Sequence, residues 1–112
     1  MVGVHPTSIT ADNLARELAV VEQQLAQGGY IGIGEIGMDL YWDTTYRDAQ
    51  QEAFATQLSL AQRYDLPVSI HCREAMAPTL DLLAAFPGVR GVMHCFSGTY
   101  PDACRVLDAG LV

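Results

Sequence analysis

Three residues that can bind a metal ion stand at the ends of short apolar segments. Glu35 lies in IGIGEIG, His71 ends PVSIH and His94 ends VRGVMH. Two imidazoles and one carboxylate suit a divalent ion such as Zn²⁺, Mn²⁺ or Fe²⁺. A bound ion would lower the pKa of a water molecule and polarise a phosphoryl or carbonyl oxygen. The alternative for each histidine is an ordinary hydrogen-bonded residue at a strand end.

The elements that must position these residues follow from the apolar spacing. Helical spacing predicts helices over about 10–27, 45–64 and 77–86, and a shorter one from 101 to 110. Strand-like segments lie between them, at 2–4, 30–37, 67–71, 89–94 and 111–112. Strands that alternate with helices indicate βαβ units and a parallel sheet.

The predicted fold class is α/β, either an open sheet or a partial (β/α)8 TIM barrel. About four parallel strands with flanking helices are expected. The barrel is favoured because the chain starts and stops inside strands and because the three polar residues all follow strand ends, which meet at one mouth of a barrel. If Val68 and Ile70 pack on the helices, alternation places His71 on the inner face, and the same phase suits His94 and Glu35. The glycines around Glu35 are expected to leave room for ions and phosphate.

Composition narrows the class of partner. The 112 residues include six arginines, no lysine and 13 acidic residues, for a formal net charge of -7. This balance argues against a broad basic surface for nucleic acid and leaves a substrate held by metal ions or by one or two arginines. No apolar run reaches membrane-spanning length, and the N-terminus lacks a signal-peptide pattern. The three cysteines show no disulfide framework, so a cytoplasmic protein is expected.

Several motifs in order resemble the TatD family of metal-dependent deoxyribonucleases, which have an amidohydrolase-like TIM barrel. They are GVHP, IGEIGMDLYW, the helix with Gln50, Phe54 and Gln57, PVSIHCREA and GVMHCFSG. The resemblance covers nearly the whole chain. It implies hydrolysis of DNA phosphodiesters, in single strands or at 3′ ends, with one or two divalent ions such as Mg²⁺, Mn²⁺ or Zn²⁺.

The resemblance also implies roles for individual residues. Glu35 matches the family carboxylate that bridges two metals, and His71 and His94 match the histidine ligands of the second metal. The family's first-strand His-x-His pair and its late Asp in a TDxP-like motif do not occur here. Residues 1–112 are therefore expected to be the central part of a single barrel domain, roughly strands three to six of eight. Such a piece is expected to be marginally folded and at best weakly active, with open sheet edges that favour self-association.

Further candidates lie near the same mouth. Arg73 would bind a phosphate through its guanidinium group, or pair with an acidic neighbour in the loop; the phosphate role is favoured. His5 suits either substrate contact or turn formation. Tyr41 would stack on a base or pack, and Ser97 would shape the substrate loop. Asp39 would orient a ligand or cap the loop.

The leading hypothesis is a TatD-type hydrolase that cleaves DNA with a metal-activated water, in which Glu35 and Arg73 are the catalytic candidates. An amidohydrolase-like enzyme acting on amides or esters is an alternative, because the same ligands polarise a carbonyl equally well. The second alternative is a fragment that binds metal without catalysing a reaction.

Overall fold

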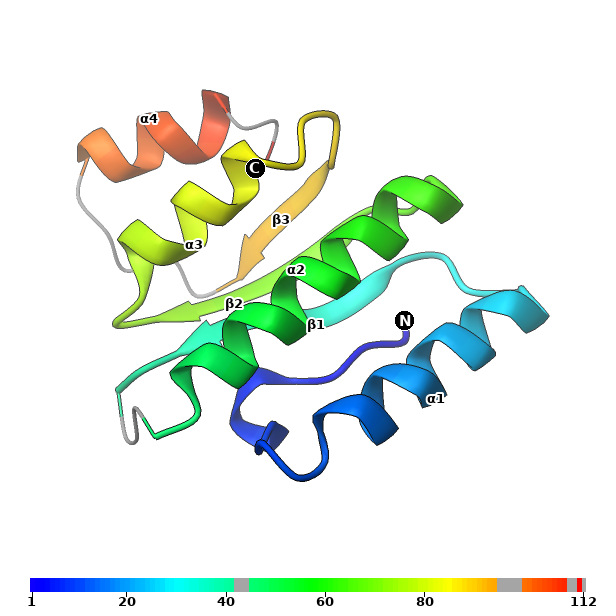
Figure 1. Cartoon of the computed structure of the whole chain (residues 1–112). Helices are drawn as coiled ribbons and strands as arrows, with labels where there is room; N and C mark the ends of the chain where they lie inside the picture. The colour runs from blue at the N-terminus through cyan, green and yellow to red at the C-terminus, as the bar shows by residue number, and fades with distance from the viewer. Residues whose placement is uncertain (42–44, 95–99, 109–110, 112) are drawn as a thin grey trace.

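A parallel sheet forms the centre of the molecule. The computed structural model describes residues 1–41, 45–94, 100–108 and 111. Within these ranges three strands pair in the order β1-β2-β3, and all run in the same direction (Figure 1). Their bounds are β1 Ile33–Asp39, β2 Val68–Arg73 and β3 Gly91–His94. The predicted α/β class with a parallel sheet is confirmed.

The outermost expected strands are shorter than predicted. Val2 forms a single parallel bridge with Ile33, and Leu111 forms one with Gly91. The described part of the chain therefore contains three strands and two single bridges instead of about four full strands. The bridges lie at opposite edges of the sheet, because Ile33 belongs to β1 and Gly91 to β3.

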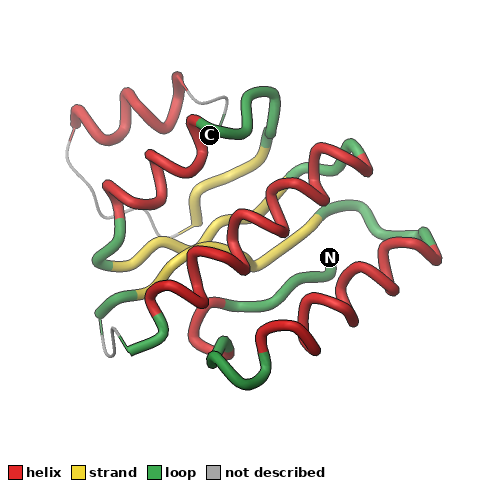
Figure 2. Tube along the Cα trace, viewed as in Figure 1, coloured by secondary structure: helices red, strands yellow, loops and turns green. Residues whose placement is uncertain are grey.

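Helices cover one face of this sheet (Figures 1 and 2). Those within the described ranges are η1 Pro6–Ser8, α1 Leu14–Gln27, α2 Arg47–Tyr64, α3 Met76–Ala84 and α4 Tyr100–Asp108. Two of the ends have a clear local cause. Gly28, with φ 81°, follows α1, and Asp65, with φ 51°, follows α2; the backbone N–H of each donates to a carbonyl of the last turn.

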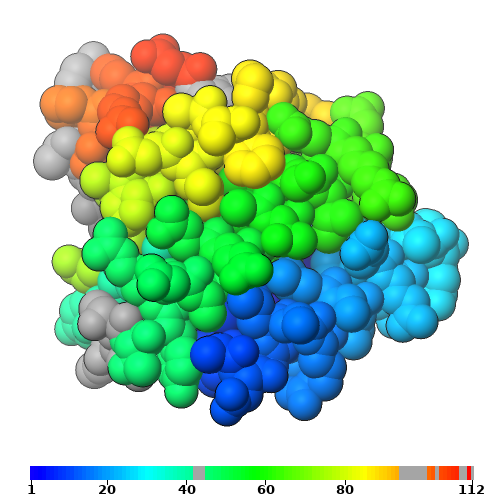
Figure 3. All heavy atoms as spheres, viewed as in Figure 1, coloured from blue at the N-terminus to red at the C-terminus, as the bar shows by residue number. Residues whose placement is uncertain are grey.

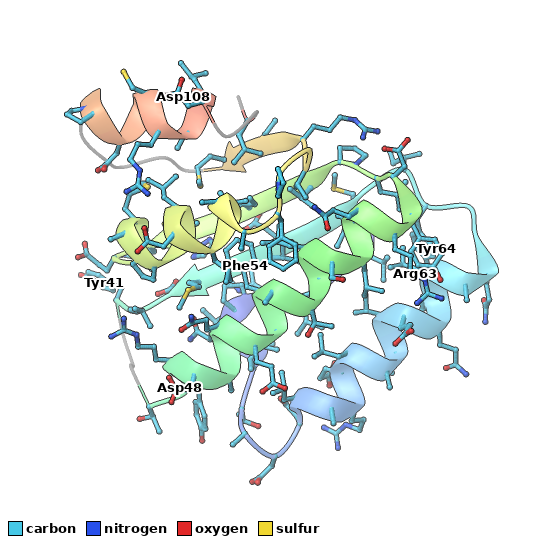
Figure 4. The ribbon with its side chains drawn as sticks, turned by 45° about the horizontal axis from the view of Figure 1, so that its top comes forward. Tyr41, Asp48, Phe54, Arg63, Tyr64 and Asp108 are labelled. Atoms are coloured by element: carbon cyan, nitrogen blue, oxygen red, sulfur yellow. The ribbon has the colours of Figure 1, made fainter. Side chains whose placement is uncertain are left out.

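The hydrophobic core lies between the helices and the sheet. Phe54 of α2 is fully buried and points toward the strands (Figure 4). In the space-filling view α2 lies between α1 and α3 (Figure 3). Along β2 the residues Val68, Ile70 and Cys72 are buried, whereas the residues between them are partly exposed. This alternation was predicted from the sequence and places His71 on the face that the helices leave open.

None of the helices in the described part of the chain combines the length and the apolar character needed to cross a membrane.

Candidate metal centre

Glu35 lies at an irregularity of β1. Gly34 pairs with Ser69 and Ile36 pairs with Ile70, so Glu35 is an extra residue between two paired positions. Such a β-bulge changes the direction of a side chain and is frequent beside functional sites. The peptide bond between Gly34 and Glu35 is cis.

The bulge decides which face of the sheet Glu35 occupies. In a regular strand, residues two apart share a face, so Glu35 would lie with Ile33 among the buried side chains. Here Ile33 and Ile36 are both fully buried although they are three residues apart. The Glu35 side chain retains 29% exposure and lies beside histidines of the open face. Simple strand alternation, on which the sequence prediction relied, does not explain this position.

The glycines of β1 allow the two strands to approach closely. A Cβ atom on Gly34 would lie 2.8 Å from the Cβ of Ser69, and one on Gly37, where φ is 135°, would collide with the carbonyl oxygen of His71. Close backbone approach is a common reason for glycine in a strand. The expectation that these glycines leave room for ions and phosphate is wrong for Gly34 and Gly37, because β2 fills that space.

Three side chains from separate segments converge on the open face. The Oε1 atom of Glu35 lies 3.2 Å from Nδ1 of His71 and 3.4 Å from Nε2 of His5. One nitrogen or oxygen from each of these residues lies within 4.8 Å of the others. The His5 and His71 rings are 4.5 Å apart between centroids. His5 precedes η1, Glu35 belongs to β1 and His71 to β2, so the parallel sheet brings them together.

The donor set fits a divalent cation. Two histidines and one glutamate form the protein ligands of many catalytic zinc sites, which keep a fourth position for water or substrate. Two ligands bound at about 2.1 Å to a tetrahedral ion lie about 3.4 Å apart, close to the measured separations of Glu35 from both rings. His71 and Glu35 are therefore near one another as predicted, while their roles as ligands stay predictions.

Asp39 contacts His71 on the ring nitrogen that does not face Glu35. Its carboxylate is only 5% exposed, and Oδ2 lies 2.8 Å from Nε2 of His71. The other oxygen, Oδ1, accepts a hydrogen bond from the backbone N–H of Tyr41 at 3.1 Å. Both roles suggested by the sequence, orienting a ligand and capping the loop, are compatible with these contacts.

His5 has its own fixed environment. It precedes η1, and its Nδ1 accepts a hydrogen bond from the backbone N–H of Thr7 at 3.2 Å. Burial lowers the pKa of His5 below its usual value of 6.5, and His71 lowers this pKa further, against the opposing effect of Glu35 and Asp39. His5 thus takes part in a turn, which was one of the two alternatives, and it also faces Glu35. Its contact with a substrate stays a prediction.

The remaining candidates are distributed around the centre. The Arg73 guanidinium carbon lies 3.8 Å from the centroid of the Tyr41 ring, at the carboxyl end of the strands (Figure 4). His94 pairs through its backbone register with His71, but its side chain lies outside the described residues. Ser97 also lies outside them.

Comparisons with known proteins identify the family. A family model described as TatD related DNase matches residues 1–112. The chain belongs to the TatD related DNase family. Among curated relatives, it is 35% identical to an uncharacterized metal-dependent hydrolase, YabD, of Bacillus subtilis, over 88% of this chain and 39% of that protein. It is 38% identical to the 3′-5′ ssDNA/RNA exonuclease TatD of Escherichia coli K12, over 97% of this chain and 42% of that protein.

A solved structure supports the same assignment. The TatD homologue YJJV from Escherichia coli K12 superposes with a TM-score of 0.84 at 33% identity, over 98% of this chain and 43% of that one. The partial TIM-barrel class predicted for this TatD family chain is thereby confirmed. The chain spans about two fifths of the length of the curated relatives it matches.

Two features of this TatD family site were missed from sequence. His5 was considered for substrate contact or a turn, yet its Nε2 also lies 3.4 Å from Oε1 of Glu35. The buried glutamines Gln50 and Gln57 hold the backbone of the segments that carry Asp39 and His5. The available signal was their spacing of seven residues, two helical turns, on the apolar face of α2.

Proposed function

We propose that this chain carries part of the active centre of a metal-dependent deoxyribonuclease that hydrolyses DNA phosphodiesters from 3′ ends. The observation that carries the proposal is the convergence of His5, Glu35 and His71 on the open face of the sheet. The names of the relatives, which include metal-dependent hydrolase and 3′-5′ ssDNA/RNA exonuclease, support the reaction and the substrate. The alternatives of amide or ester hydrolysis and of metal binding without catalysis are outcomes of the test below.

Each residue of the centre has a proposed task. Glu35 and His71 are metal ligands, with His94 as a further ligand from the neighbouring strand. His5 contacts the substrate phosphate or Oε1 of Glu35. One or two ions of Mg²⁺, Mn²⁺ or Zn²⁺ would supply an activated water and stabilise the charge that develops at phosphorus.

Arg73 and Tyr41 form the proposed substrate contact at the mouth. The position of the Arg73 guanidinium group over the Tyr41 ring limits the directions in which Arg73 can reach. A guanidinium held in this way can bind two oxygens of one phosphate. Tyr41, with 48% exposure, offers a surface for base stacking, and Ser97 is proposed to line the same loop. An enzyme that holds one terminal phosphate needs few basic residues, in accord with the net charge of -7.

The domain and cellular context are proposals as well. Residues 1–112 are proposed to form the central part of a single TatD-type barrel, since they match 42% of the length of the relatives. The open sheet edges favour self-association. The cytoplasm is the proposed compartment, where Cys72 and Cys104, both free thiols, would stay reduced.

The test is hydrolysis of single-stranded DNA labelled at either end, with Mg²⁺, Mn²⁺ or Zn²⁺ and with a chelator as the metal-free condition. Shortening from the 3′ end that needs a metal is expected, at a low rate. Glu35→Gln should lower this rate at least about 100-fold, because an amide binds the metal more weakly than a carboxylate does and loss of a supporting partner alone costs about 10–100-fold. Glu52→Gln, an equal charge change at an exposed position of α2, should leave it unchanged.

Two results would oppose the proposal. Metal-dependent cleavage of amide or ester substrates without cleavage of DNA would favour the amidohydrolase alternative. Metal binding by a folded chain that hydrolyses none of these substrates would favour the non-catalytic fragment.

A further inference from the structure

We propose that Asp39, held in place by Gln50, is a positioning residue that fixes the proton of His71 on Nε2 and so presents Nδ1 to the metal centre. The proposal rests on the proposed function, since it concerns His71 as a ligand. It names the ligating atom and the residues that select it.

The contact between Asp39 and His71 determines where the proton must be. An ionised carboxylate only accepts hydrogen bonds. Oδ2 of Asp39 lies 2.8 Å from Nε2 of His71, so Nε2 carries a hydrogen and donates it. A neutral imidazole has a single N–H, which leaves the lone pair on Nδ1.

The lone pair of Nδ1 faces the centre. Nδ1 of His71 lies 3.2 Å from Oε1 of Glu35, and both atoms are acceptors in this protonation state. Two acceptors at this distance require either a proton between them, on the ring or on the carboxylate, or a cation that both can bind. Histidine ligands of metals commonly donate their other N–H to a carboxylate, which fixes the ring and the tautomer.

Gln50 fixes Asp39 in turn. The Gln50 side chain is 4% exposed; its Oε1 accepts the backbone N–H of Asp39 at 2.8 Å, and its Nε2 donates to the backbone C=O of Asp39 at 3.0 Å. The backbone N–H of Tyr41 binds the carboxylate oxygen that His71 does not use. The position of the carboxylate is therefore set by the first turn of α2 and by the loop after β1.

His5 lies beside Glu35 as well, but it turns a different kind of ring nitrogen toward this carboxylate. Nδ1 of His5 accepts from the backbone N–H of Thr7 at 3.2 Å, and the Thr7 hydroxyl, which can donate to the same atom, lies 2.7 Å from it. With Nδ1 as the acceptor, the hydrogen of the neutral ring is on Nε2, the atom 3.4 Å from Glu35. His5 is thus set to donate to Glu35, whereas His71 is set to offer a lone pair. The two histidines of the centre consequently have distinct roles.

Asp39→Asn tests the inference with almost no change of volume. An amide presents either an oxygen or an N–H group to Nε2, so it no longer enforces one tautomer. In the zinc-free chain, two-bond ¹H–¹⁵N NMR spectra should show His71 protonated at Nε2 in the wild type and a shift toward Nδ1–H in the variant. Zn²⁺ affinity by calorimetry should fall about 10–100-fold, the usual cost of losing such a supporting partner.

Asp65→Asn is the matched control. Asp65 lies at the end of α2, before β2, and its side chain is 90% exposed. This variant should keep both the His71 spectrum and the Zn²⁺ affinity of the wild type. Circular dichroism establishes whether each variant folds. If Asp39→Asn does not fold, Asp39→Ser replaces it, because the serine hydroxyl is too short to reach Nε2 of His71.

An unchanged His71 tautomer in Asp39→Asn overturns the inference, as does an unchanged affinity for Zn²⁺. If the wild-type chain binds no Zn²⁺, the proposed function fails, and the NMR spectra still decide whether Asp39 sets the tautomer.

Discussion

Replacing Gln57 by leucine should destabilise the chain, because this side chain satisfies a buried backbone group near the centre. Oε1 of Gln57 accepts the N–H of Val4 at 2.8 Å, and both residues are buried. Leucine has a similar volume but no acceptor, so the Val4 N–H would remain buried without a partner. The C=O of Ala53, which accepts from Nε2 of Gln57, retains its place in the helix ladder.

The expected loss in free energy of unfolding is about 1–3 kcal/mol, the cost of one unsatisfied buried donor. With a urea dependence of about 1–3 kcal/mol per molar, the midpoint should fall by about 1 M at an unchanged slope. Gln51→Leu makes the same chemical change at the exposed neighbour in α2 and should stay within about 0.5 kcal/mol of the wild type.

Urea unfolding followed by circular dichroism measures both variants, and amide exchange reports on Val4 directly. The amide of Val4 loses its acceptor in Gln57→Leu, so it should exchange faster in that variant than in Gln51→Leu. Equal midpoints for the two variants would refute the reasoning. A loss of stability without faster exchange at Val4 would show that this hydrogen bond is not its source.

Further predictions concern the core, the thiols and His5. Phe54→Ala should cost about 3–5 kcal/mol in urea unfolding, because Phe54 is fully buried against the sheet; a loss below about 1 kcal/mol would contradict the packing. Burial raises the pKa of the Cys72 thiol, so iodoacetamide should label Cys104 before Cys72, as read by mass spectrometry; equal rates would contradict this. In the metal-free chain, NMR titration of His5 should give a pKa below 6.5. Since folding favours its neutral form, the contribution of His5 to stability is complete above pH 6.5 and declines as the pH falls toward the lower folded-state pKa; a pKa above 6.5 would reverse that sign.

The sequence predicted the elements well because their signals are local. The helical spacing of apolar residues and the glycine and proline stops placed α1, α2 and α3 within a few residues of their observed bounds. The alternation of β2 put His71 on the open face, as observed. Single-residue bridges at Val2 and Leu111 could not be distinguished from short strands, since pairing depends on contacts far along the chain.

The centre itself was only partly predictable. Alternation could not reveal the bulge that turns Glu35 away from the core, because a bulge depends on the register between two strands. The convergence of His5 on Glu35 depends on the turn of η1 and on the hydrogen bond between Gln57 and Val4. His94 and Ser97 stay predictions, because the first has an undescribed side chain and the second lies outside the described residues.

The central claim is that Glu35 and His71 hold a divalent ion, and direct titration of the metal-free chain with Zn²⁺ tests it. The wild type and Glu52→Gln should bind with equal affinity. Loss of a supporting partner costs about 10–100-fold in affinity, so loss of a ligand in Glu35→Gln should weaken binding at least about 100-fold. Equal Zn²⁺ affinity in all three proteins would contradict the account.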